Sequence, residues 1–109
     1  MNRCELFLKL WLEAAKDHVY FVPRKKNIKS LEKLGLTTEL AKEILLSLTS
    51  ADYYKGPEED HDSTRSGEIW IFKKKLDENI TLYIKIKLIK DKKGFIAKCL
   101  SFHQWEDMK

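Results

Sequence analysis

The chain has 109 residues, a mass of 12.9 kDa and a formal net charge of +4. At roughly 100–200 residues per domain, this length predicts one domain that spans residues 1–109. Hydrophobic residues make up 43% and charged residues 35% of the chain, which excludes a disordered tail, and four glycines and two prolines exclude a collagen-like or low-complexity protein.

The apolar runs are far shorter than the roughly 20 residues that a membrane span requires. Glu5 and Lys9 interrupt the N-terminal apolar stretch, and no small-residue cleavage site follows it, so we expect a cytoplasmic protein without a membrane partner. Cys4 and Cys99 have neither CxxC spacing nor histidine neighbours in a zinc pattern. We therefore expect two free, mostly buried thiols and no zinc site.

Residues 3–17 predict a helix, in which a narrow polar stripe leaves a wide apolar face. Such a face is typical of a helix that packs against a sheet or against a partner subunit. Residues 19–22 then predict a short strand that Pro23 ends.

Two further helices are predicted before residue 50. Asn27 is expected to cap a short helix that Gly35 ends, and Thr37 is expected to cap the next one. The residues expected on the buried faces of these two helices are Ile28, Leu31 and Leu34, and then Leu40, Ala41, Ile44, Leu45 and Leu48.

Residues 50–67 are polar, rich in turn-forming residues and without periodicity, which predicts a long loop. Three strand-like runs follow at residues 68–75, 80–90 and 95–104, with separators short enough for hairpins. We therefore expect an α+β fold of two layers. Its N-terminal helices would pack on one face of an antiparallel sheet that ends in a three-stranded meander.

The basic residues are concentrated in two blocks, one around residues 24–29 and one over residues 73–98, with an acidic run between them. A basic surface with a local acidic loop indicates a polyanionic ligand, and nucleic acid is the leading candidate. The alternative is a lysine-rich surface that is simply solvated.

Alternation along the last two strands predicts which side chains share a face. In residues 80–90, five aliphatic side chains alternate with polar ones and must point into the core. In residues 95–104, Ile96, Leu100 and Phe102 are expected on one face, and Cys99, Ser101 and His103 on the other. The side chains expected on one uncovered surface are Tyr83, Lys85, Lys87, Ser101 and His103. This surface either binds RNA, by stacking, phosphate neutralisation and proton transfer, or is an ordinary solvent-facing sheet.

The predicted loop adds three cationic or potentially cationic residues, Lys55, His61 and Arg65. Its acidic run, from Glu58 to Asp62, would pair with these cations, clamp a basic partner or, if the carboxylates converged, bind Mg²⁺. Adjacent acidic residues in a loop are usually solvated, so we expect no metal site. The sequence contains no glycine-rich phosphate loop, no Ser/His/Asp spacing and no HExxH motif.

Four segments, at residues 52–57, 67–72, 83–87 and 99–103, together resemble the MqsR family of toxins from bacterial type II toxin–antitoxin systems. The stretch from Tyr20 to Leu36 also fits a branch of that family, so the resemblance covers residues 4 to 105. The resemblance implies a RelE-like α+β fold, an endoribonuclease that cuts mRNA with or without the ribosome, no cofactor, and a cognate antitoxin partner.

The family's catalytic positions match Lys55, Tyr83 and Lys85, and a basic residue of the last strand is His103 here. The residue after Trp70 is a glutamine in the best-known member and Ile71 here. The resemblance therefore implies either that this branch uses other residues, with Arg65 and Arg24 the leading candidates, or that its chemistry is weaker. The residues expected to bind RNA are Arg24, Arg65 and Lys87.

Metal-independent cleavage needs a group that takes the proton of the RNA 2′-hydroxyl, cations that stabilise the phosphorane-like transition state, and a group that protonates the departing 5′ oxygen. His103 is the expected acid or base, Lys55 and Lys85 the expected cations, and Tyr83 would position the phosphate or a nucleobase. Two other hypotheses for the function stay open. One is a non-catalytic module that binds RNA or an antitoxin, and the other is a structural subunit that docks through the helix at residues 3–17.

Overall fold

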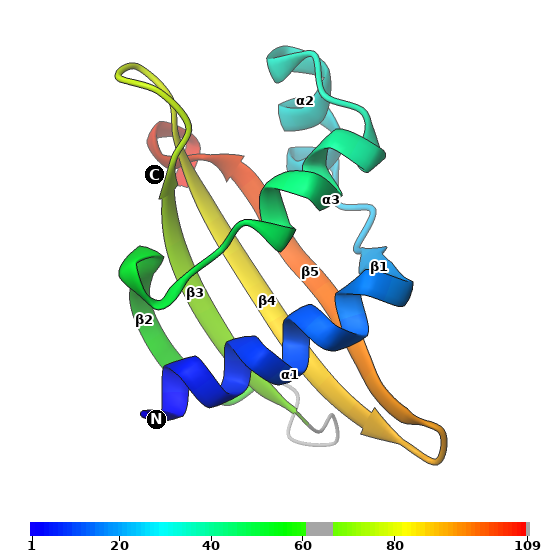
Figure 1. The fold of residues 1–109 in the computed structure, drawn as a ribbon. Helices are drawn as coiled ribbons and strands as arrows, with labels where there is room; N and C mark the ends of the chain where they lie inside the picture. The colour runs from blue at the N-terminus through cyan, green and yellow to red at the C-terminus, as the bar shows by residue number, and fades with distance from the viewer. Residues whose placement is uncertain (61–66, 109) are drawn as a thin grey trace.

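The computed structural model describes residues 1–60 and 67–108. The described chain forms an α+β fold, in which helices cover one face of a five-stranded sheet (Figure 1). The helices are α1 (Arg3–Asp17), α2 (Lys25–Leu34) and α3 (Thr38–Leu46), and the strands are β1 (Val19–Phe21), β2 (Tyr53–Glu58), β3 (Glu68–Lys75), β4 (Thr81–Asp91) and β5 (Gly94–Gln104). Short 3₁₀ helices, η1 (Ser50–Asp52) and η2 (Trp105–Met108), precede β2 and follow β5.

The strand order in the sheet is β1-β5-β4-β3-β2. Strands β2 to β5 pair in antiparallel fashion, whereas β1 runs parallel to β5, so the sheet is mixed rather than purely antiparallel. The predicted fold class and the C-terminal meander are confirmed. None of the helices in the described residues is long and apolar enough to cross a membrane.

The core lies between the helices and one face of the sheet. From α1, Phe7, Leu8 and Trp11 pack into it, so most of the wide apolar face of this helix is used within the chain, and Leu6 stays exposed. The side chain of Trp11 is fully buried, and its indole N–H donates to the backbone oxygen of Lys87 at 3.1 Å. Both cysteines are free and buried, as expected.

Two predicted details differ in the region between residues 22 and 35. Helix α2 begins at Lys25 with Arg24 at its N-cap, so Asn27 does not cap it but lies buried inside it. Its amide donates to the backbone oxygens of Val22 and Leu100 and accepts from the N–H of Phe102, at 2.9–3.0 Å. Asn27 thereby ties the helix to β5, and this tie turns Ile28, expected in the core, toward solvent. Gly35 and Thr37 cap the helices as predicted.

Part of the long predicted loop is a strand. Residues 53–58 form β2, the edge strand beside β3, although the sequence YYKGPE has no alternating pattern. Gly56 has φ +128°, and a Cβ atom there would lie 3.0 Å from the backbone oxygen of Ile69. A glycine is therefore required where β2 crosses close to β3.

The prediction of which side chains share a face of β5 also needs correction. Ser101 pairs with Lys85 but Cys99 pairs with Ile86, so Leu100 is an extra residue in β5. This β-bulge shifts the alternation by one, and Cys99 therefore points into the core with Phe102. The expected grouping of Cys99 with Ser101 and His103, and of Leu100 with Phe102, is wrong for this reason.

Candidate ribonuclease site on the sheet face

The candidate site lies on the sheet face opposite the core, where directly paired residues point to the same side. Residues that pair directly across neighbouring strands form a row on this face. In one row, Tyr83 on β4 pairs with Lys73 on β3 and with His103 on β5. The next row crosses four strands and contains Lys55, Ile71, Lys85 and Ser101. The register therefore brings the four predicted catalytic residues Lys55, Tyr83, Lys85 and His103 onto one face. The expectation that this face is uncovered is wrong in part, because Lys87, Ser101 and His103 are buried.

The centre of this face is a stacked pair. The rings of Tyr83 and His103 lie 5.0 Å apart between centroids, at an interplanar angle of 14°. The side chain of His103 is buried, and its Nδ1 lies 3.0 Å from the backbone oxygen of Gln104. Because a carbonyl oxygen only accepts, this hydrogen bond places a proton on Nδ1.

Burial raises the pKa of Tyr83, the negative charge of Glu58 raises it further, and the positive charge of Lys55 partly offsets both effects. The phenol is therefore a neutral hydrogen-bond donor at neutral pH. The Lys55 ammonium lies 3.3 Å from a carboxylate oxygen of Glu58, and its side chain is 62% exposed. Lys85, on the neighbouring row, is partly buried.

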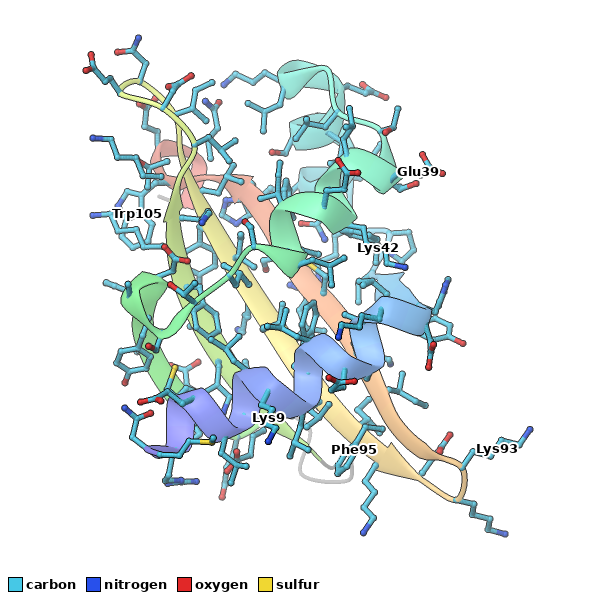
Figure 2. All side chains as sticks on the ribbon, in the orientation of Figure 1. Lys9, Glu39, Lys42, Lys93, Phe95 and Trp105 are labelled. Atoms are coloured by element: carbon cyan, nitrogen blue, oxygen red, sulfur yellow. The ribbon has the colours of Figure 1, made fainter. Side chains whose placement is uncertain are left out.

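Aromatic side chains that the sequence analysis did not select border this pair. Trp105, in η2, lies 5.8 Å from Tyr83 and 4.8 Å from Tyr54 between ring centroids, and the ammonium of Lys73 lies 4.6 Å from its ring centre. Trp105 lies at the end of the sheet opposite the β4–β5 turn that carries Lys93 (Figure 2). Tyr54 and Trp105 offer faces on which bases can stack. The available signals for this cluster were the positions of Trp105 two residues after His103 and of Tyr54 directly before Lys55.

The structure describes two of the three residues predicted to bind RNA, Arg24 and Lys87, and they differ in exposure. Arg24 is exposed at the N-cap of α2. The Lys87 side chain lies on the site face but is only 3% exposed, and its ammonium pairs with Asp60 at 2.8 Å. Arg65, like His61 and Asp62, lies outside the described residues.

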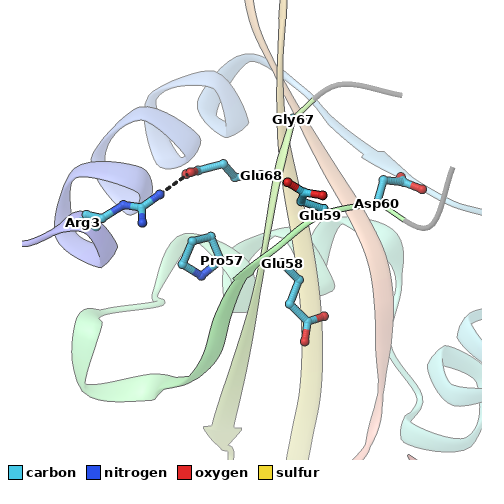
Figure 3. Close-up of a pocket in the computed structure, with 7 residues that line it drawn as sticks. All are labelled: Arg3, Pro57, Glu58, Glu59, Asp60, Gly67 and Glu68. Carbon is cyan, nitrogen blue, oxygen red and sulfur yellow. Dashed lines mark hydrogen bonds and ion pairs between the residues drawn. The ribbon is translucent and has the colours of Figure 1, made fainter. Parts of the chain in front are cut away.

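A cavity of about 550 Å³ opens beside this face, between the start of α1 and the ends of β2 and β3. Its lining residues are Arg3, Pro57, Glu58, Glu59, Asp60, Gly67 and Glu68, and Arg3 forms an ion pair with Glu68 (Figure 3). This predominantly acidic lining disfavours RNA phosphates, so we place the candidate site on the Tyr83–His103 face. Within residues 1–60 and 67–108, no three His, Cys, Asp or Glu side chains are grouped so as to hold a metal ion.

A comparison with protein-family models identifies the chain. The model described as "Motility quorum-sensing regulator, toxin of MqsA" matches residues 6–104. No curated protein and no solved structure matches. The match includes all five strands, α2, α3 and all of α1 except its first three residues, so it extends over nearly the whole chain. The chain therefore belongs to the MqsR toxin family, and it is the toxin of a toxin–antitoxin system whose partner is an antitoxin.

Proposed function

We propose that the chain is a metal-independent endoribonuclease that cleaves mRNA by attack of the 2′-hydroxyl on the adjacent phosphate. The observation that carries the proposal is the stacked pair of Tyr83 and His103, which shares one sheet face with Lys55 and Lys85 in a member of a toxin family. The pair combines a neutral phenol, which donates a hydrogen bond, with an imidazole, which is a general acid or base in many enzymes.

The chemistry follows from what RNA provides. The 2′-hydroxyl is a nucleophile built into the substrate, so the protein has to move two protons and stabilise negative charge. In this proposal His103 moves one proton, Lys55 and Lys85 stabilise the charge that develops on the phosphate, and the Tyr83 hydroxyl positions a phosphate oxygen. The products are a 2′,3′-cyclic phosphate, or the 3′-phosphate from its hydrolysis, and a 5′-hydroxyl.

Substrate binding would combine the exposed cation of Arg24, and Arg65, with stacking on Tyr54 and Trp105. The proposal covers cleavage of mRNA both alone and on the ribosome. Both substrates are therefore included in the test.

The test is RNA cleavage by the purified toxin in EDTA, with Tyr83→Phe and His103→Ala in parallel and with the chemistry of the RNA ends determined. We expect cyclic-phosphate ends from the wild type and a loss of cleavage of about 10²–10⁴-fold for His103→Ala. Intact RNA both with and without translating ribosomes would overturn the proposal.

One observation favours a second function, a module that binds RNA or the antitoxin without cleavage. Ile71 lies between Lys55 and Lys85 in the same row and is only 2% exposed, so this position offers no polar group to a phosphate. Such a module would bind RNA in a salt-sensitive manner and leave the RNA intact. The same cleavage assay separates the two functions.

A further inference from the structure

A register shift in β2 places one carboxylate on the site face. Lys55 pairs with Ile71 and Glu58 pairs with Ile69, so β2 uses three residues where β3 uses two. Regular alternation would put positions 55 and 58 on opposite faces, and the irregularity puts them on the same one. Figure 3 shows the Glu58 carboxylate pointing away from those of Glu59 and Asp60.

Glu58 is an acidic residue that reaches the catalytic candidates. One of its carboxylate oxygens lies 3.3 Å from the Lys55 ammonium, and 32% of its side chain is exposed, so a substrate can reach it. Its charge also acts on Tyr83, where it is the second contribution, after burial, to the raised pKa of the phenol. Glu58 comes from the edge strand β2 and His103 from β5, with Tyr83 on the strand β4 that lies between them.

This placement matches the requirement for two proton-transfer groups. In a phosphoryl displacement the attacking and leaving oxygens lie roughly in line, on opposite sides of the phosphorus. A base and an acid that serve them must therefore approach the phosphate from two sides. A phosphate held over Tyr83 by Lys55 and Lys85 would have the carboxylate on its β2 side and the imidazole on its β5 side.

We propose that Glu58 is the general base that takes the 2′-hydroxyl proton and that His103 is the general acid. The assignment rests on the proposed ribonuclease function. As the 2′ oxygen bonds to phosphorus, its proton passes to the Glu58 carboxylate. The bond from phosphorus to the 5′ oxygen breaks, and the His103 imidazolium gives a ring proton to that oxygen. The enzyme is left with a carboxylic acid and a neutral imidazole, and water returns the proton from one to the other.

The test uses a short RNA with a single scissile linkage, prepared with either oxygen or sulfur as the 5′ bridging atom. A thiolate leaves without being protonated, because thiols are far more acidic than alcohols. We expect His103→Ala to lose about 10²–10⁴-fold on the oxygen substrate and to regain most of that loss on the sulfur substrate. Glu58→Gln should lose a similar factor on both substrates, because both need removal of the 2′ proton.

Glu59→Gln is the matched control, since it removes the same charge at the exposed neighbouring position and should keep wild-type rates. Two results would overturn the assignment of Glu58 while the ribonuclease function stands. One is a Glu58→Gln variant that cleaves the oxygen substrate at the wild-type rate, and the other is a Glu58→Gln variant whose cleavage rate recovers on the sulfur substrate. Failure of the wild type on both substrates, together with intact mRNA in the presence of translating ribosomes, would instead overturn the ribonuclease function, and the assignment with it.

Discussion

Tyr83 and His103 occupy directly opposite positions on β4 and β5, and their rings stack 5.0 Å apart. The histidine is held from both sides, by this stack and by the hydrogen bond from Nδ1 to the Gln104 oxygen. The geometry fixes the orientation of the ring before substrate binds, and it makes the contribution of the Tyr83 hydroxyl separable from that of its ring.

Tyr83→Phe removes the hydroxyl and keeps the stack. We expect RNA cleavage to fall about 10–100-fold, because a hydrogen bond to a charged group contributes about 1.5–3 kcal/mol, and each 1.36 kcal/mol is a factor of ten in rate. The thermal midpoint should change little. The measurement is single-turnover cleavage in EDTA together with thermal unfolding, and a wild-type rate in this variant would remove Tyr83 from the site.

The raised pKa of Tyr83 predicts an effect at alkaline pH. Burial and the Glu58 carboxylate keep the folded phenol protonated at pH values above about 10, where an unfolded tyrosine ionises. The folded state then binds more protons than the unfolded state, so the free energy of unfolding falls as the pH rises from about 10 through the folded-state pKa. Tyr83→Phe should make this decline shallower in urea unfolding between pH 9 and 11. Equal declines in both proteins would contradict the assigned environment.

Removal of the buried ammonium of Lys87 should destabilise the fold. Lys87→Met keeps an unbranched apolar stem but deprives Asp60 of the cation at 2.8 Å. Breaking a buried ion pair on one side costs about 3–5 kcal/mol, and Lys90→Met, at an exposed position of the same strand, should cost less than about 0.5 kcal/mol. Urea unfolding measures both. Equal stability of the two variants would show that the Lys87 ammonium is solvated.

Lys55 and Lys87 should differ in how they affect RNA binding. The exposed Lys55 is available to a phosphate, so Lys55→Gln should reduce the slope of log affinity against log salt by about 0.7 for single-stranded RNA. Lys87→Met should leave that slope unchanged, because its ammonium is already paired with Asp60. Fluorescence anisotropy with a non-cleavable 2′-deoxy oligonucleotide, over a range of salt concentrations, measures both slopes. A reduced slope for Lys87→Met would support the contact with RNA predicted for this residue.

Asn27 should contribute strongly to stability. Its amide forms three hydrogen bonds to backbone groups of Val22, Leu100 and Phe102. Asn27→Leu, of similar size, should lower the free energy of unfolding by about 2–4 kcal/mol, because each buried hydrogen bond contributes about 1 kcal/mol and orphaned partners cost more. Lys26→Ala, at the exposed adjacent position, is the control. Unfolding midpoints that coincide for the two variants would show that water replaces the amide.

The sequence alone determined the fold class and the centre of the candidate site. The alternation of Leu82, Ile84 and Ile86 with Tyr83 and Lys85 holds along the regular part of β4, since period-two patterning follows directly from strand geometry. The C-cap of α2 at Gly35 and the N-cap of α3 at Thr37 were predicted correctly as well, because capping depends on local backbone chemistry.

Only the tertiary structure decided what depends on contacts between distant segments. The bulge at Leu100 lies beside the hydrogen bonds of Asn27, from a helix more than 70 residues earlier, and it sends Cys99 into the core. The strand β2 exists because β3 offers an edge to pair with, although residues 55–58 (KGPE) are of types depleted in strands. The irregular register of that pairing places Glu58 on the site face, and no local pattern in the sequence encodes it.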